Sequence, residues 1–89
     1  MNKFSESAAR QRIINGLKKF IATIEGILAD KLLWNATRHD AEPFDVGAET
    51  VIRGLATQQL KAWERGDVKT ANEIAEKMIP VVSAWRQAD

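Results

Sequence analysis

Residues 13–34 have the sequence IINGLKKFIATIEGILADKLLW, and the spacing of their apolar side chains decides the fold. Six of these side chains follow one another at steps of four, three, four, three and seven positions, which is the period of an α-helix with one apolar stripe. The six are Ile13, Leu17, Phe20, Ile24, Ile27 and Trp34. Lys18, Lys19 and Glu25 fall on the opposite side. The stretch therefore predicts a long amphipathic helix rather than one that is buried all round.

The predicted helix extends from about Ser5 to about Trp34, with Ser5 or Ser7 capping its start. A helix of about 30 residues is roughly 45 Å long, whereas a compact domain of 89 residues is about 26 Å across. Two arrangements would resolve this mismatch. The helix kinks or breaks at Gly16 or Gly26, each of which costs about 1 kcal/mol relative to alanine, or a second chain covers the surplus of the stripe.

After this helix, Pro43, Asp45 and Gly47 are residues that favour a loop, so an ordered connection is predicted between about residues 35 and 47. We expect Phe44 to pin it. Asp45 is the predicted N-cap of a second helix that runs to Arg65. Residues 66 and 67 are a glycine and an aspartate. Glycine tolerates the left-handed conformation that ends a helix, and aspartate caps the next one. So short a turn predicts two antiparallel helices.

A third helix is predicted from Val68 to about Gln87, and Pro80 interrupts it. Proline lacks a backbone donor and clashes with the carbonyl four residues earlier, so we expect either a kink or a separate fourth helix from Pro80. The predicted fold is a small all-α bundle of three helices, or of four with a break at Pro80. It combines a long N-terminal amphipathic helix, half of which is covered by an antiparallel C-terminal hairpin, in a single helical domain spanning residues 1–89.

Composition limits the classes of function. The 13 basic and 12 acidic residues give a formal charge of +1, which provides no strong overall field for nucleic acid or anionic lipid. The sequence has no cysteine, which excludes disulfides, thiolate zinc sites and a cysteine nucleophile and is typical of a cytoplasmic protein. Charged residues interrupt every apolar stretch before about 18 residues, so no membrane span and no membrane partner are predicted.

His39 is the only histidine, and Asp40 and Glu42 lie close to it in the sequence. These groups suggest a proton relay or a weak metal site, but a lone imidazole with loop carboxylates lacks the ligand set of a specific metal site. We therefore interpret His39 as an exposed loop residue. The sequence predicts no catalytic residue, no cofactor, no metal and no enzymatic activity.

The lack of catalytic motifs and the surplus of helical apolar surface favour a non-enzymatic protein–protein interaction module. We expect a small regulator, adaptor or inhibitor that forms a homodimeric helical bundle, as accessory proteins of phages and mobile elements often do. Its predicted partners are a second copy of itself and another protein. The predicted dimer or partner interface is the six-residue stripe from Ile13 to Trp34 defined above.

An alternative hypothesis is a nucleic-acid-binding accessory protein. The N-terminal segment carries several basic side chains against the single acid Glu6. The candidates for phosphate contact are Arg10, Arg12, Lys18 and Lys19. They project in different directions, and no aromatic side chain lies among them for base stacking, so a solvated or ion-paired surface is the favoured interpretation.

Overall fold

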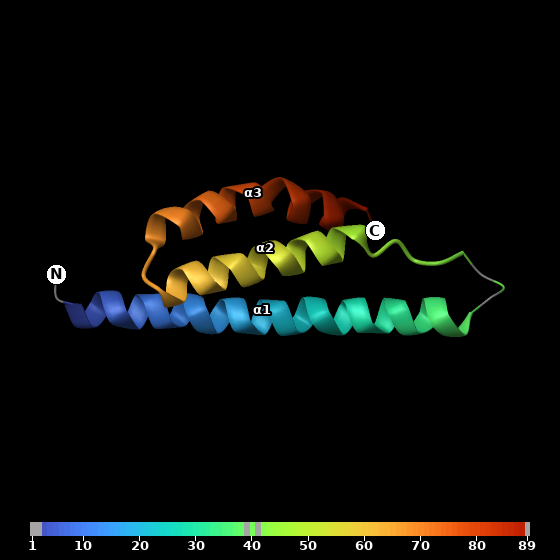
Figure 1. The fold of residues 1–89 in the computed structure, drawn as a ribbon, viewed down its shortest axis with the longest axis horizontal. Helices are drawn as coiled ribbons and strands as arrows, with labels where there is room; N and C mark the ends of the chain where they lie inside the picture. The colour runs from blue at the N-terminus through green and yellow to red at the C-terminus, as the bar shows by residue number, and fades with distance from the viewer. Residues whose placement is uncertain (1–2, 39, 41, 89) are drawn as a thin grey trace.

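The chain folds into three α-helices, and no strand occurs among the residues that the structure describes (Figure 1). The helices are α1 (Lys3–Thr37), α2 (Gly47–Glu64) and α3 (Val68–Gln87). This computed structural model describes residues 3–38, 40 and 42–88. The all-α class and the three main helices predicted from the apolar periodicity are confirmed.

α1 is a single straight helix of 35 residues, about 52 Å long at 1.5 Å per residue (Figure 1). It passes through Gly16 and Gly26 without interruption, so the predicted kink or break is wrong. The packing of the apolar side chains between these positions outweighs the low helix propensity of two glycines. The helix begins at Lys3, which places Ser5 and Ser7 inside it, so the predicted cap at these serines is also wrong.

α2 and α3 lie side by side and form the predicted hairpin, joined through residues 65–67 (Figure 1). Gly66 has a φ of +79°, a left-handed conformation that glycine adopts readily. The Asp67 carboxylate accepts a hydrogen bond of 3.1 Å from the Thr70 N–H and caps the start of α3. The helix stop at Gly66 and the helix cap at Asp67 are therefore both confirmed.

The start of α2 is displaced by one residue from the prediction. The N-cap position is occupied by Val46 rather than Asp45, and the valine side chain makes no capping hydrogen bond. Asp45 still satisfies one of the free donors at the helix end, because its Oδ1 accepts a hydrogen bond of 2.9 Å from the Gly47 N–H. A local turn built by the aspartate side chain therefore replaces the predicted cap.

Pro80 lies inside α3, which continues as one helix from Val68 to Gln87. The predicted separate fourth helix is therefore wrong. Figure 1 shows α3 bowed, with its convex side away from α2. A bend of this kind lets a helix accommodate a proline ring that would otherwise clash with the preceding turn.

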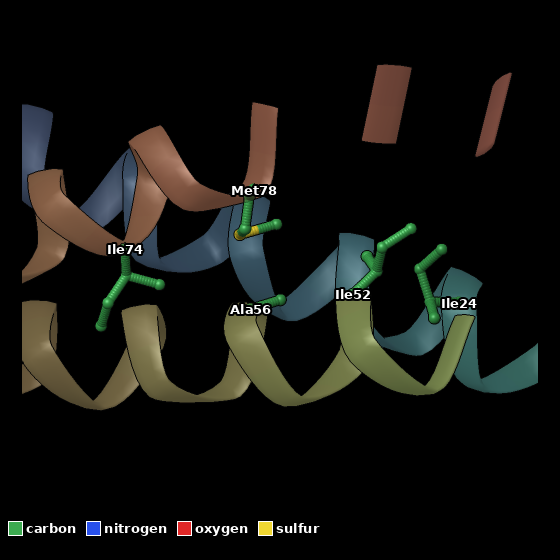
Figure 2. Close-up of a cluster of buried hydrophobic side chains, with 5 residues drawn as sticks. All are labelled: Ile24, Ile52, Ala56, Ile74 and Met78. Atoms are coloured by element: carbon green, nitrogen blue, oxygen red, sulfur yellow. The ribbon is translucent and has the colours of Figure 1, made fainter. Parts of the chain in front are cut away.

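α2 lies between the other two helices and packs against both. Among the described residues, α1 and α3 have no pair of Cα atoms within 8 Å, so these two helices are the most widely separated. Side chains from all three helices nevertheless meet in one core, which Figure 2 shows in close-up. Its buried members are Ile24, Ile52, Ala56, Ile74 and Met78.

The hairpin was predicted to cover half of α1, but of its two helices only α2 has Cα atoms within 8 Å of α1 among the described residues. At one end, the Arg10 guanidinium donates hydrogen bonds of 3.0 and 2.9 Å to the carbonyl oxygens of Trp63 and Glu64, at the end of α2. Near the other end, Lys31 pairs with Glu49 in the first turn of α2. α2 therefore lies along α1 from Arg10 to Lys31.

Replacing Gly66 by alanine is expected to lower the free energy of unfolding by about 1 kcal/mol, because alanine resists the left-handed conformation. A Cβ at this position would meet only Arg10 side-chain atoms, at 3.8 Å or more, so backbone strain rather than a clash produces the loss. Urea unfolding followed by circular dichroism measures the effect. Gly54→Ala inside α2, where the added Cβ also has room, is the control and should stabilise the helix. Equal losses for the two changes would contradict the prediction.

Candidate functional site

Two rows of apolar side chains, each repeating every seven residues, run side by side along α1. One row is Ile14, Ile21 and Leu28, and the other, which we call the outer row, is Ile13, Phe20, Ile27 and Trp34. Ile14 is 7% exposed whereas its neighbour Ile13 is 39% exposed. At this end of α1, α2 therefore covers the first row more completely than the outer row.

The structure divides the predicted interface between core and surface. Ile24 has no exposed surface and belongs to the core, and Phe20 is half-buried against the same cluster. Of the other members, Leu17 and Ile27 are half-buried, and Ile13 and Trp34 are exposed. Ile24 is therefore used within the chain, and the surface that a partner can contact consists of the outer row together with Leu17.

Trp34 contacts an aromatic ring and a guanidinium group near the C-terminal end of α1. Its ring lies 5.9 Å from the ring of Phe44, and the Arg38 guanidinium lies 4.3 Å from the Trp34 ring centre. Asn35 holds Phe44 in place, because its side chain accepts a hydrogen bond of 2.7 Å from the Phe44 N–H and donates one of 3.0 Å to the Phe44 carbonyl oxygen. The connection is therefore anchored by the Asn35 side chain at the Phe44 backbone, while the Phe44 side chain, predicted to pin it, is 47% exposed.

The chain exposes more surface than a compact protein of its mass. Its accessible surface is 6477 Å², whereas a monomeric protein of 10.0 kDa is expected to expose about 5,200 Å². The radius of gyration is 15.9 Å, against about 12 Å expected for 89 residues. Large apolar side chains contribute to the exposed surface, notably Ile13, Leu32, Leu33 and Ile79.

Glu49 is a buried carboxylate that connects all three helices. It lies in the first turn of α2 and is only 1% exposed. Its Oε2 accepts a hydrogen bond of 2.6 Å from Lys31 Nζ of α1 and one of 2.7 Å from Trp85 Nε1 of α3. Its Oε1 is also buried and has no hydrogen-bond partner. Because an unpaired buried acceptor costs about 1–3 kcal/mol, half of this carboxylate is left unused at a cost to stability.

Burial raises the pKa of Glu49, but hydrogen bonds from Lys31, from the backbone N–H of Glu49 itself and from Trp85 outweigh it and leave the pKa below its ordinary value of 4.5. The folded state therefore binds this proton less readily than the unfolded state. The contribution of Glu49 to stability is fully present above about pH 4.5 and is lost as the pH falls through the lowered pKa.

We expect the difference in the free energy of unfolding between the wild type and Glu49→Gln to shrink as the pH falls from about 6 to about 3. Glutamine has a similar shape and does not titrate, so the subtraction isolates the ionisation of this carboxyl. Urea unfolding at several pH values measures the difference. A difference that stays constant over this range would show that Glu49 does not contribute through its charge.

An open groove of about 510 Å³ lies beside this carboxylate, between the start of α2 and the second half of α3. The residues that line it include Lys31, Ala48, Glu49, Val81, Ala84 and Trp85. Pockets that bind small molecules have volumes of roughly 300–1,000 Å³ and mostly apolar walls. The groove therefore has the size and composition of a ligand site.

Sequence analysis missed both Glu49 and the groove. Lys31 and Trp85, which bind this carboxylate, lie 18 and 36 positions away, so local pattern does not connect them. One signal was present in the sequence: Glu49 precedes Ile52 by three residues and Ala56 by seven, which places an acidic residue on the apolar face of a helix.

Of the four basic residues proposed to contact nucleic acid, Arg10 and Lys18 line one surface pocket between α1 and the end of α2. Arg10 uses its guanidinium within the chain, at the end of α2. Arg12, Lys18 and Lys19 are exposed, and Lys18 projects about 100° around the helix from Lys19. Nucleic-acid contact by these residues stays a prediction.

His39, considered above as a proton relay or metal ligand, lies outside the described residues. Within the part of the chain that the structure describes, none of the three helices combines the length and the apolarity needed to cross a bilayer. The fold and its surfaces define an all-α, three-helix protein with a partly covered apolar helix. Comparison with family models, curated proteins and solved structures found no match to this chain.

Proposed function

We propose that this protein is a non-enzymatic protein–protein interaction module that works as a homodimer, with the outer row of α1 as the pairing surface. Together with Leu17, the row gives from Ile13 to Phe20 the steps of four and three residues with which a helix inserts its side chains between those of a partner helix. A two-fold axis would set each outer row against the same row of the second copy. The dimer would act as a small regulator, adaptor or inhibitor by docking on another protein.

The surplus of exposed surface is the observation that supports this proposal most directly. Relative to a compact monomer, the chain exposes an excess of about 1,200 Å². If each copy buried that excess against the other, the pair would bury about 2,400 Å² in total, which falls within the range of stable homodimer interfaces. Ile13, Leu17 and Ile27 supply apolar side chains that retain exposed area on α1.

Sedimentation velocity at tens of micromolar protein tests the proposal. We expect a species of about 20 kDa, twice the 10.0 kDa of one chain. Ile13→Glu, which places a charge in the outer row, is expected to raise the dimer dissociation constant about tenfold or more, a loss of about 1.4 kcal/mol.

Val51→Glu is the matched control, because Val51 is an exposed apolar residue of α2 outside the outer row. It is expected to leave the dissociation constant unchanged. A stable 10.0 kDa monomer in the wild type would refute the homodimer. Equal weakening by both variants would place the interface elsewhere.

A further inference from the structure

We propose that the groove between α2 and α3 is a binding site for a small apolar amine, whose ammonium group donates a hydrogen bond to Glu49 Oε1. The site contains no residue of the outer row, so the proposal does not rest on the homodimer. It rests on the unused oxygen of Glu49, on the charges around the groove and on the shape of its walls.

The unused oxygen determines the polar end of the ligand. A carboxylate accepts up to about four hydrogen bonds, and Glu49 receives two from other side chains, both at Oε2. Oε1 is buried and has no partner. It can be satisfied only by a donor, so an ammonium group fits the position, whereas a carboxylate or a phosphate would be repelled.

The charges at the groove favour a cation. Among the described residues, three ionisable side chains line it, the acids Asp45 and Glu49 and the base Lys31. The positive charge of Lys31 is already paired with Glu49 at 2.6 Å. Asp45 accepts a hydrogen bond from the Gly47 N–H but has no ion-pair partner among the described lining residues. A ligand with one positive charge would bring the lining close to neutrality, and a charged donor makes a stronger hydrogen bond to a carboxylate than a neutral donor does.

The walls determine the rest of the ligand. Ala48, Val81, Ala84 and Trp85 present aliphatic and aromatic surface, and the volume of about 510 Å³ accommodates an amine with a short alkyl chain or a ring. Oε1 has no exposed area, so binding has to rearrange the lining side chains. The Trp85 indole N–H is bonded to the same carboxylate and therefore reports this rearrangement.

Titration of ¹⁵N-labelled protein with n-hexylamine at neutral pH, followed by NMR, tests the site. The expected result is a saturable shift of the Trp85 indole signal and of the backbone amides of Ala48 and Ala84. n-Hexanol, with the same chain and a neutral donor, should bind about tenfold more weakly, and n-hexanoate should not bind. Absence of a saturable shift with hexylamine, or equal binding of all three compounds, would overturn the proposal.

Two variants locate the binding. Glu49→Gln removes the charge and should weaken hexylamine binding about tenfold or more. Ala84→Leu fills the groove without touching the carboxylate and should abolish binding while the circular dichroism spectrum stays that of the wild type. Ala29→Leu on the exposed side of α1 is the control and should bind hexylamine normally. Wild-type affinity in folded Ala84→Leu would show that the amine binds elsewhere and would overturn the assignment.

Discussion

Replacing Glu49 by alanine is expected to lower the free energy of unfolding by about 3 kcal/mol. The change leaves the half-buried indole N–H of Trp85 without its acceptor and removes the counter-ion of Lys31. It also removes a side chain that is hydrogen-bonded to both α1 and α3. Among the described residues, these two helices have no Cα atoms within 8 Å of each other. Because small domains have only about 5–15 kcal/mol of total stability, chemical and thermal unfolding should detect the loss clearly.

Glu25→Ala is the matched control for this prediction. Glu25 also pairs with a cation on another helix, Arg53, at 3.1 Å, but both side chains are about half exposed. Exposed ion pairs contribute about 0–1 kcal/mol, so the control should cost far less. Similar losses of unfolding free energy for the two alanine variants would contradict the prediction, because burial would then not increase the contribution of Glu49.

Replacing Ile24 by alanine is expected to cost about 3 kcal/mol of unfolding free energy, within the range measured for deleting large buried aliphatic side chains. Ile24 is the α1 member of the core cluster and has no exposed surface, and Figure 2 shows it beside Ile52 of α2. Urea unfolding at high and low protein concentration should give the same loss, because these contacts lie within one chain.

Ile79→Ala provides the comparison, since Ile79 is the same residue type and is 67% exposed. It should cost less than about 0.5 kcal/mol. If Ile24→Ala lowered the free energy of unfolding only at high protein concentration, Ile24 would instead contact a second copy of the chain. That outcome would contradict its place in the core.

Local chemistry accounts for the parts of the fold that could be predicted. Gly66 and Asp67 act through their own backbone conformation and through a hydrogen bond three residues away, so their roles follow from adjacent residues. The apolar stripe of α1 was predictable for the same reason, because helical periodicity is visible within one segment. The kink predicted at Gly16 or Gly26 was wrong, because helix propensity is a weak effect that packing overrides.

The candidate sites depend on tertiary packing and were only partly predictable. Ile13 and Ile24 belong to the same stripe, yet the structure leaves one exposed and buries the other completely. Which of them faces a neighbour depends on where α2 and α3 lie, and the periodicity of α1 does not contain that information. Glu49 is the stronger case, because its partners come from helices on both sides.

The hydrogen-bond acceptors of Arg10 lie 53 and 54 positions further along the chain. On the ribosome, α1 is therefore synthesised before the segment that covers it. About 27 more residues must be added after Thr37 to complete α2, which takes roughly 1–5 s at ordinary rates of synthesis. Until α2 is in place, Ile24 has no cover from its own chain, so chaperones and neighbouring nascent chains can bind a surface that the finished protein covers only in part.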